Sequence, residues 1–598
     1  MCGIIGYVGS PTSDNTLEIL TDGLSRLEYR GYDSTGVAIS NSSLDVYKRR
    51  GELTELEDVL PDQSTNGSAG IGHTRWSTHG PPTDENAHPH TDCNETVAVV
   101  HNGIIENYQQ LRETLEADGH EFDSETDTEI IPHLIEAALE RDGDIERAFR
   151  YAITMLEGSY AVAAVFSGRD EVYAARNQSP LVVGIGDDGY FLASDIPAFL
   201  DYTEDVVYLE NGQFAAIRSD SIQISDERGA PVETPVETVD WSTEDTGKSG
   251  HERYMLKEIY EQPRALRKCL QGRLRESDGS VSIEAVEDME KPKQIHVVAC
   301  GTSYHASLYA ARLFRDRGVP STAFMASEYD VDTIPIDTET LVVGVTQSGE
   351  TADTLEALRE ANRVGAETLS VTNVTGSSAS RETDRVVYIR AGPEIGVAAT
   401  KTFAAQLVAL AMISITLTND SAATFVEALR TLPELVQSVL DRSRAKEIAT
   451  EYADSDAYFF IGRGYNAPAA LEGALKTKEI TYKHAEGFSA GELKHGPLAL
   501  VTDKTPVFAV IPRDGNFEKM VGNVKEVEAR EAPVIAVTDA AEAVEPLADH
   551  VLRIPQTDRR LAPILANVQL QLVSYWIANE LGRSIDKPRN LAKSVTVK

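Results

Sequence analysis

The sequence contains little lysine. It has 18 Lys against 37 Arg, and no Lys between Lys48 and Lys248. Asp and Glu total 95 against 55 Lys and Arg, which gives a formal net charge of −40. So acidic a surface repels phosphate backbones, and we expect no nucleic-acid partner. Few lysines and many carboxylates suggest a halophilic host with a salty cytoplasm; an ordinary acidic mesophilic protein is the alternative.

Cysteines and long apolar runs are also scarce. The four cysteines form no CxxC pair, which excludes a disulfide framework or zinc ribbon and suits a reducing cytoplasm. No apolar run reaches ~18 residues and no basic leader is present, so neither a membrane span nor a secretory signal is expected. The spacing of the histidines in residues 73–101 matches no metal-ligand pattern, and we predict neither metal nor cofactor. These histidines, which lie near Cys93, are His73, His79, His88, His90 and His101.

The length of 598 residues predicts several domains, at ~150 residues each. Residues 1–250 carry 15 basic and 47 acidic side chains (15 − 47 = −32), and the remainder carries 40 and 48 (40 − 48 = −8). Short apolar runs within residues 2–218 predict two packed sheets with a few helices. Residues 219–250 are polar and acidic, which is typical of a linker.

From about residue 290 the pattern alternates between apolar strand and helix. Residues 295–299, 341–346 and 386–390 read as strands, and 303–317 and 351–364 as helices. A similar order returns later, which predicts a duplicated α/β unit at about 290–425 and 455–585. Parallel sheets with ligands at the carboxyl ends of their strands would follow.

Cys2 is the first candidate nucleophile. Removal of Met1 would leave its thiol on the same residue as a free α-amine, whose pKa of ~7.7–8.0 suits proton acceptance. Nucleophile and base on one residue need no distant histidine. Position alone favours an ordinary terminal residue, so the surrounding motifs decide.

Those motifs are MCGIIGYVG, RLEYRGYDSTG, GHTRWSTHG, NAHPH, VVHNGIIENY and SETDTE, in that order. Together they resemble the class II glutamine amidotransferase domain of the N-terminal nucleophile superfamily, over residues 2–218. The resemblance implies an αββα sandwich in which Cys2 attacks the side-chain amide of glutamine. Asn102 and the Gly103 N–H would stabilise the oxyanion. The implied glutamine-binding residues are Arg30, Arg75, Trp76, Thr78, His79, Gly103 and Asp127.

ACGTSYHA (299–306) and TQSGETADT (346–354) each join an apolar strand to a helix. Helix N-termini with hydroxyl side chains bind phosphate, although the same residues also serve as plain helix caps. Both junctions resemble the sugar isomerase (SIS) family of three-layer α/β phosphosugar domains. The implied sugar-phosphate ligands are Thr302, Ser303, Gln347, Ser348, Thr351, Val397 and Ala592.

The strings EIGVAATKTF, LEGALKTKEITYKHAEGFSAGELKHGPLAL and DKPRNLAKSVTVK narrow this resemblance. With the amidotransferase motifs in front, the whole chain resembles the isomerizing glutamine–fructose-6-phosphate aminotransferase family. We therefore expect a cytoplasmic homodimer. Its parts would be an amidotransferase domain (2–218), a linker (219–250), SIS domains (251–435 and 436–586) and a catalytic tail (587–598).

The resemblance also assigns chemistry to the scarce lysines, four of which fall in residues 476–494. Lys593 would form a Schiff base with the open sugar, a reaction closed to arginine. Glu479 would move a proton between C1 and C2, and His495 would assist ring opening, reaching the partner subunit's site. Lys476 lies three residues before Glu479 on the same helical face. There it would assist the ring chemistry or keep the Glu479 carboxylate ionised.

Three details stay open on the sequence. Thr346 stands where many members of the family have serine, which leaves the strength of phosphate binding undecided. Cys300 receives no role. Trp76 is the candidate gate for ammonia. Alternatives to this function are another amidotransferase with a different phosphosugar acceptor, and a regulator that only senses sugar phosphate.

Overall fold

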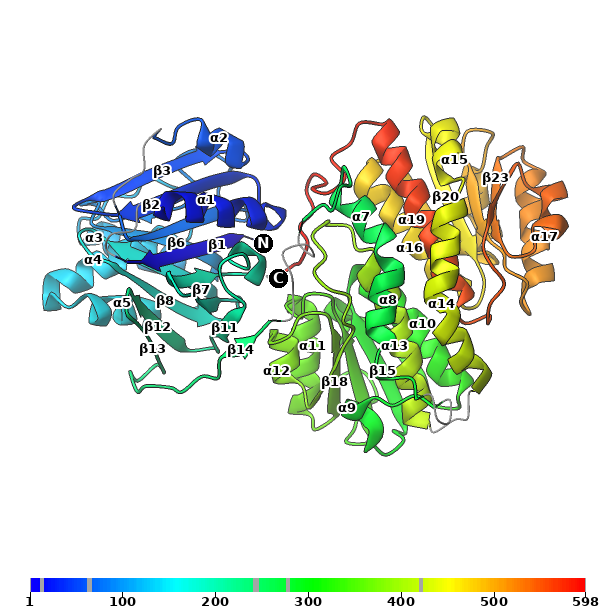
Figure 1. Ribbon diagram of the computed structural model, residues 1–598, viewed down its shortest axis with the longest axis horizontal. Coiled ribbons are helices and arrows are strands. Elements are labelled where there is room, and N and C mark those ends of the chain that lie inside the picture. Colours follow the sequence, from blue (N-terminus) through cyan, green and yellow to red (C-terminus); the bar gives the residue numbers. More distant parts are fainter. Residues whose placement is uncertain are drawn as a thin grey trace. The chain divides into compact units, whose positions relative to one another are not determined.

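The computed structural model describes residues 2–10, 15–61, 67–239, 247–275, 280–418 and 423–596. The chain divides into two compact units (Figure 1). The N-terminal unit runs to residue 246 and also includes the tail from Ala592, and the C-terminal unit covers residues 247–591.

The N-terminal unit contains two antiparallel sheets, with the strand orders β14-β11-β9-β10-β1-β4-β2-β3 and β13-β12-β8-β7-β6-β5. Its strands are β1 (Gly3–Gly9), β2 (Ser34–Ser40), β3 (Leu44–Arg50), β4 (Ala69–Arg75), β5 (His90–Thr91), β6 (Val97–Ile105), β7 (Gly158–Phe166), β8 (Glu171–Asn177), β9 (Val182–Ile185), β10 (Gly189–Ala193), β11 (Asp205–Tyr208), β12 (Gln213–Arg218), β13 (Ser221–Ser225) and β14 (Glu237–Thr238). Its α-helices are α1 (Thr16–Leu27), α2 (Leu53–Glu57), α3 (Tyr108–Ala117), α4 (Ile130–Asp142) and α5 (Ile145–Thr154).

Strand alternation produces four layers in this unit. On β1, Ile4 and Val8 belong to the core between the two sheets, whereas Ile5 and Tyr7 belong to the core shared with α1. On β6 of the second sheet, Val99 belongs to the core on that sheet's outer face, which includes residues of α4 and α5. Successive side chains of a strand point to opposite faces, so each sheet packs on its partner sheet and on helices. This arrangement confirms the expected αββα sandwich.

The C-terminal unit contains two parallel five-stranded sheets of matching order, β16-β15-β17-β18-β19 and β21-β20-β22-β23-β24. The strands are β15 (Gln294–Ala299), β16 (Ser321–Met325), β17 (Thr340–Val345), β18 (Glu367–Thr372), β19 (Arg385–Tyr388), β20 (Ala457–Gly462), β21 (His484–Ser489), β22 (Val507–Val510), β23 (Val534–Thr538) and β24 (His550–Arg553). The α-helices are α7 (Tyr254–Tyr260), α8 (Gln262–Leu270), α9 (Glu284–Glu287), α10 (Gly301–Asp316), α11 (Ala352–Arg363), α12 (Ser378–Glu382), α13 (Lys401–Thr418), α14 (Ala423–Arg442), α15 (Ala445–Tyr452), α16 (Asn466–Thr481), α17 (Phe517–Glu528), α18 (Ala541–Val544) and α19 (Ala562–Glu580).

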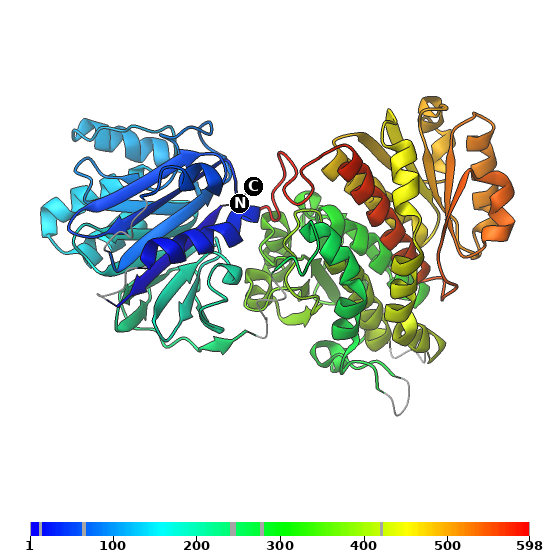
Figure 2. The same ribbon diagram turned by 45° about the horizontal axis from the view of Figure 1, so that its top comes forward.

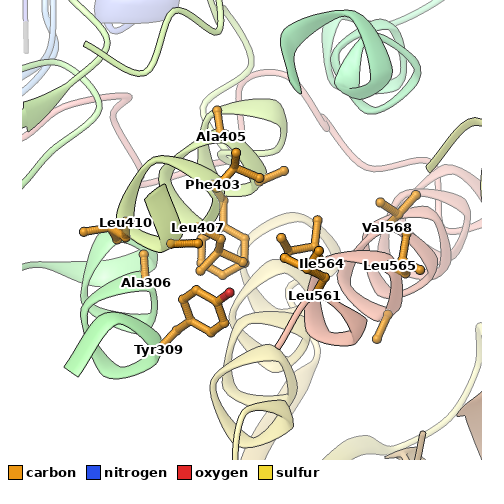
Figure 3. Close-up of a cluster of buried hydrophobic side chains, with 14 of the residues drawn as sticks. Ala306, Tyr309, Phe403, Ala405, Leu407, Leu410, Leu561, Ile564, Leu565 and Val568 are labelled. Atoms are coloured by element: carbon orange, nitrogen blue, oxygen red, sulfur yellow. The ribbon is translucent and has the colours of Figure 1, made fainter. Parts of the chain in front are cut away.

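One continuous core joins the two repeats of this unit. Figure 2 shows that helices lie between the sheet that contains β15 and the sheet that contains β20. Figure 3 shows Tyr309 of α10 beside Phe403 of α13, with Ile564 of α19 nearby. Among the described residues, α13 is the one helix long and apolar enough to cross a membrane, but 89% of its 18-residue window is buried inside the protein. Its composition is therefore that of a core helix.

The structure differs from the sequence prediction within residues 219–250. Ser221–Ser225 forms β13 and pairs with β12, and Glu237–Thr238 forms β14 and pairs with β11. β13 (SIQIS) does alternate between polar and apolar residues, but only over five residues at the start of a polar, acidic segment. β14 (ET) contains no apolar residue, so no periodicity marks it. Residues 240–246 lie outside the described residues.

Candidate active sites

Cys2 lies immediately before β1, where strands from both sheets approach one another. Gly3 pairs with Thr74 of β4, and the Trp76 N–H donates to Cys2 Sγ at 3.2 Å. From β6 in the other sheet, Asn102 Nδ2 donates to the Cys2 carbonyl oxygen at 2.9 Å. The sandwich therefore brings together the predicted nucleophile and the predicted oxyanion donor, which are 100 residues apart.

A buried histidine positions Asn102. His73 Nε2 lies 3.1 Å from Asn102 Oδ1 and 3.1 Å from the His101 carbonyl oxygen. Burial, the strongest influence, lowers the pKa of His73 to about 3, although the hydrogen bond to Asn102 acts in the opposite direction. The ring is therefore neutral, and its proton belongs on Nε2, between two acceptors. Holding Oδ1 in this way turns the Asn102 NH₂ group toward Cys2.

Gly103 must be glycine at its position in β6, beside Cys2. Its φ is +133°, and a side chain there would collide with the Ser159 carbonyl oxygen on the neighbouring β7. Only glycine adopts this conformation without strain. Its backbone N–H can therefore face a ligand at close range, as the oxyanion role requires.

A pocket opens beside Cys2. Arg30 forms part of it, donating through Nε to the Cys2 carbonyl at 3.1 Å and through Nη1 to Asp195 at 3.0 Å. Thr596, near the end of the chain, contributes to the wall. The lining residues are Cys2, Arg30, Trp76, Thr78, Asn102, Gly103, Ser179, Pro180 and Thr596. Ser179, Pro180 and Thr596 were not predicted, because nothing local in their sequence marks them.

Arg75 and Asp127 are not among the residues that line this pocket. Both side chains instead form hydrogen bonds with nearby backbone groups. The Arg75 guanidinium donates to the carbonyls of His79 and Gly80, the latter at 3.1 Å, while Asp127 accepts from the Ile105 N–H at 2.8 Å. Burial lowers the pKa of Arg75, and Cys2, Asp33 and Asp127 act in the opposite direction. The two predicted glutamine ligands thus lie within electrostatic reach of each other. Arg75 also fixes the segment that contains Trp76, Thr78 and His79.

A buried charge cluster occupies α16 in the C-terminal unit. Lys476 Nζ lies 2.5 Å from Glu479 Oε2 and 3.5 Å from Glu472 Oε1. Burial alone would lower the pKa of Lys476, but the two carboxylates raise it above its ordinary value. Lys476 is therefore a permanent ammonium group that stabilises the ionised form of Glu479. The predicted pairing of Lys476 and Glu479 on one helical face is confirmed.

Glu472 is a site residue that sequence reasoning missed. Its side chain is fully buried and accepts hydrogen bonds from Thr302 Oγ1 at 3.0 Å and His305 Nδ1 at 2.7 Å. These contacts connect α16 to the start of α10, so the two repeats meet at this carboxylate. The available signal was its position four residues before Lys476, in a helix that is otherwise apolar at that face.

The loop between β17 and α11 is built around its own hydroxyl groups. Thr346 is buried; its Oγ1 accepts from the Gly349 N–H at 3.2 Å and lies 3.0 Å from Thr351 Oγ1. Gly349 has a φ of +71°, and a side chain there would collide with Ser377. The Thr346 hydroxyl thus orders the loop that holds Gln347 and Ser348 before the N-terminus of α11.

The remaining predicted residues lie in other places. The Val397 N–H donates to the Asp586 carbonyl at 3.1 Å, and Ser303 Oγ receives a hydrogen bond from Gln406 Nε2 at 3.0 Å. His495 is exposed at the end of the 3₁₀ turn Glu492–Lys494, on a different element from Lys476 and Glu479. Ala592 and Lys593 belong to the tail that groups with the N-terminal unit.

Comparison with known protein families matches both halves of the chain. The glutamine amidotransferase domain matches residues 73–201, and the SIS domain matches residues 288–416 and 451–580. The C-terminal domain of glucosamine-fructose-6-phosphate aminotransferase from Francisella tularensis is 39% identical, with a TM-score of 0.54, and covers 57% of this chain and 100% of its own. The class is thus an amidotransferase joined to a duplicated sugar isomerase fold.

Full-length relatives define the family more narrowly. Isomerizing glutamine–fructose-6-phosphate aminotransferases from Halobacterium salinarum, Thermus thermophilus and Thermococcus kodakarensis are 51%, 46% and 47% identical, each over 100% of both chains. The chain belongs to the isomerizing glutamine–fructose-6-phosphate aminotransferase family.

Proposed function

We propose that this enzyme converts fructose 6-phosphate and glutamine into glucosamine 6-phosphate and glutamate. The observation that carries the proposal is that one chain contains both half-sites. Cys2 lies beside Asn102, and the Lys476–Glu479 pair stands on the helix whose Glu472 binds Thr302 of the first SIS repeat. Full-length identity of 51% to a named relative supports the pairing of these two chemistries.

Glutamine hydrolysis would take place in the N-terminal unit. The α-amine of Cys2 takes up the thiol proton, and the thiolate attacks the amide carbon. The protonated amine then returns the proton to the leaving nitrogen, so that ammonia departs and a γ-glutamyl thioester remains on Cys2. Water hydrolyses this thioester, which releases glutamate and restores the thiol. Asn102 Nδ2 and the Gly103 N–H donate to the oxyanion, each such donor being worth ~10²–10³ in rate. Arg75 would pair with the substrate carboxylate and Asp127 with its ammonium group, with Arg30, Trp76, Thr78 and His79 surrounding them.

Sugar isomerisation would take place in the C-terminal unit, with help from the tail. Gln347, Ser348 and Thr351 at the start of α11, and Thr302 and Ser303 in α10, would hold phosphate and hydroxyl groups through neutral donors. Lys593 forms the Schiff base with C2, which ammonia then replaces. The ionised Glu479 carboxylate acts as the base that moves a proton between C1 and C2, and His495 assists ring opening. Val397 and Ala592 would contact the sugar through their backbone.

We also propose the wider organisation that the sequence predicts. The chain would work as a homodimer in the cytoplasm, with an amidotransferase domain at 2–218 to which β13 and β14 add edge strands, SIS domains at 251–435 and 436–586, and a catalytic tail at 587–598. The exposure of His495 suits a residue that acts on the partner subunit's substrate. Size-exclusion chromatography with light scattering measures the assembly, and a monomeric active enzyme would contradict it.

The test of function uses purified full-length protein with glutamine and fructose 6-phosphate. Glutamate and glucosamine 6-phosphate should form together. Cys2→Ala should lower glutamate release by at least about 10³-fold, as expected when a nucleophile is lost. The same variant should still isomerise fructose 6-phosphate. Glu479→Gln should instead keep glutamine hydrolysis and lose isomerisation. Amino sugar formed from glutamine by Cys2→Ala would overturn the mechanism, and hydrolysis with no sugar turnover would favour a regulator.

A further inference from the structure

A second cluster of reactive side chains lies in the N-terminal unit, apart from the residues that line the Cys2 pocket. Cys93 comes from the turn between β5 and β6, His120 from the segment after α3, and His133 and Glu136 from successive turns of α4. One ligand atom from each residue lies within 4.8 Å of every other. Cys93 is exposed, whereas His133 and Glu136 are buried.

The separations within this cluster suit a tetrahedral ion. Cys93 Sγ lies 3.7 Å from His120 Nδ1 and 3.5 Å from His133 Nδ1. Glu136 Oε2 lies 2.9 Å from His120 Nδ1 and 3.4 Å from His133 Nδ1. Bonds to zinc of about 2.0–2.3 Å place tetrahedral ligand atoms roughly 3.3–3.7 Å apart, so a small contraction or expansion accommodates the ion.

The chemistry of the four groups points in the same direction. One thiolate, two imidazoles and one carboxylate form a mixed S, N and O set, which favours zinc over magnesium or calcium. Asn94 Nδ2 donates to Glu136 Oε1 at 2.6 Å, while Oε2 faces the histidines and also accepts from the Cys93 N–H at 3.3 Å. Support of this kind orients a ligating carboxylate. We propose that Cys93, His120, His133 and Glu136 form a zinc site.

Such a site would brace the glutamine pocket from outside. The turn that contains Cys93 leads into β6, which carries Asn102 and Gly103. The segment that begins at His120 leads to Asp127 and is already held by Glu129, which accepts from the Ser124 N–H at 2.7 Å. An ion at Cys93 would join both segments to α4. This role is structural, because none of the four ligands lines the Cys2 pocket.

The histidines that stand out in the sequence are a different group. The His88 ring stacks on that of His73 and meets that of His90 edge to face, and all three are buried. The cluster proposed here instead takes Cys93 with histidines farther along the chain. Its one regular spacing, His133 to Glu136, is a single helical turn, which is too common to predict a metal from sequence.

The experiment uses full-length Cys2→Ala protein, so that the nucleophile cannot bind metal. After treatment with chelator and desalting, one equivalent of Co²⁺ should give the intense thiolate and tetrahedral absorption bands, and Zn²⁺ should abolish them. The bands should be lost with Cys93→Ser and weakened at least tenfold in affinity with His120→Gln. The control Cys300→Ser, which removes a thiol outside the cluster, should keep them. Metal analysis should give one zinc per chain.

Thermal unfolding provides a second readout. Zinc should raise the unfolding temperature of the parent and of Cys300→Ser but not of Cys93→Ser. Weak octahedral cobalt spectra that are unchanged by Cys93→Ser would mean adventitious binding to surface carboxylates, and would overturn the proposal. So would absence of any stoichiometric metal. Glutamate formation is measured separately, with the Cys93→Ser enzyme in which Cys2 is intact. This measurement distinguishes a failure of the zinc proposal from a failure of the proposed function.

Discussion

The histidines around Cys2 and the lysine on α16 differ in how burial affects their charge. Around Cys2, burial lowers the pKa of His73, His88, His90 and His101, so these rings are uncharged. On α16 of the C-terminal unit, Lys476 keeps its charge because Glu472 and Glu479 surround it. Both solutions avoid an isolated buried charge, the first by neutralisation and the second by pairing. They fail under different perturbations, which makes the comparison testable.

The largest effect is expected from Lys476→Met. This change leaves the fully buried Glu472 and the half-buried Glu479 without their shared cation, and removing one partner of a buried pair costs about 3–5 kcal/mol. The Glu479 pKa should rise, so the isomerase pH profile should shift upward while glutamine hydrolysis is unchanged. Denaturant unfolding and pH–rate profiles measure both. An unshifted profile in a folded variant would show that Lys476 does not control Glu479.

In the wild type, the Lys476 pKa is raised above that of the unfolded chain. Its contribution to stability is therefore complete below the unfolded value near 10.5 and is lost as the pH rises through the folded value. The ion pair is consequently intact throughout the neutral range, and alkali should affect the C-terminal unit.

Acid should affect the N-terminal unit instead. His73 has a folded pKa of about 3 and a model value of 6.5, so the unfolded chain binds more protons between them, and stability falls as the pH drops below 6.5. That histidine alone is worth ~4 kcal/mol by pH 3. At pH 4–5 the histidine-rich sandwich should therefore open more readily than the C-terminal sheets. Hydrogen exchange measures this as an earlier loss of amide protection in the N-terminal unit. Simultaneous opening of both units would contradict the contrast.

A smaller effect tests His73 as a positioning residue. His73→Ala frees the Asn102 amide to rotate, and kcat for glutamine hydrolysis should fall ~10–10²-fold, less than the loss of the donor itself. KM should change little. The double variant with Asn102→Ala should be no worse than Asn102→Ala alone, since His73 acts through that amide. Additive losses would assign His73 a merely structural role.

The smallest effect concerns salt. Residues 1–250 carry −32 of the net charge of −40, so self-repulsion is concentrated in the N-terminal unit. Raising KCl from 0.1 M, where the screening length is ~10 Å, should stabilise this unit by about 1–2 kcal/mol more than the other. Calorimetry with two resolved transitions gives the difference. Equal shifts would remove the argument for a halophilic host.

Much of the fold follows from periodicity. The strands 295–299 and 341–346 and the helix 303–317 lie within a residue or two of β15, β17 and α10, because strands buried on both faces read as continuous apolar runs. β18 (ETLSVT) was missed, since its polar residues hide the pattern. β13 was missed because its five-residue alternation begins a polar, acidic segment, and β14 because its two residues are both polar.

The sites divide along a similar line. Cys2, Asn102, Lys476 and Glu479 stand in recognisable motifs, and the structure brings the members of each pair together. Glu472 is a buried carboxylate whose partners, Thr302 and His305, lie about 170 residues earlier. Long-range tertiary contacts of this kind have no local signature. Ligand roles for these residues stay predictions until substrate binding is measured.

The wall beside Cys2 contains Thr596, the last residue that the structure describes. On the ribosome the N-terminal sandwich emerges first, yet this part of its pocket is synthesised only after both parallel sheets. A nascent chain would therefore have an incomplete pocket until the C-terminal unit has been made. For the same reason a chain truncated at residue 586 should lack part of this wall, even though every strand of the sandwich is present.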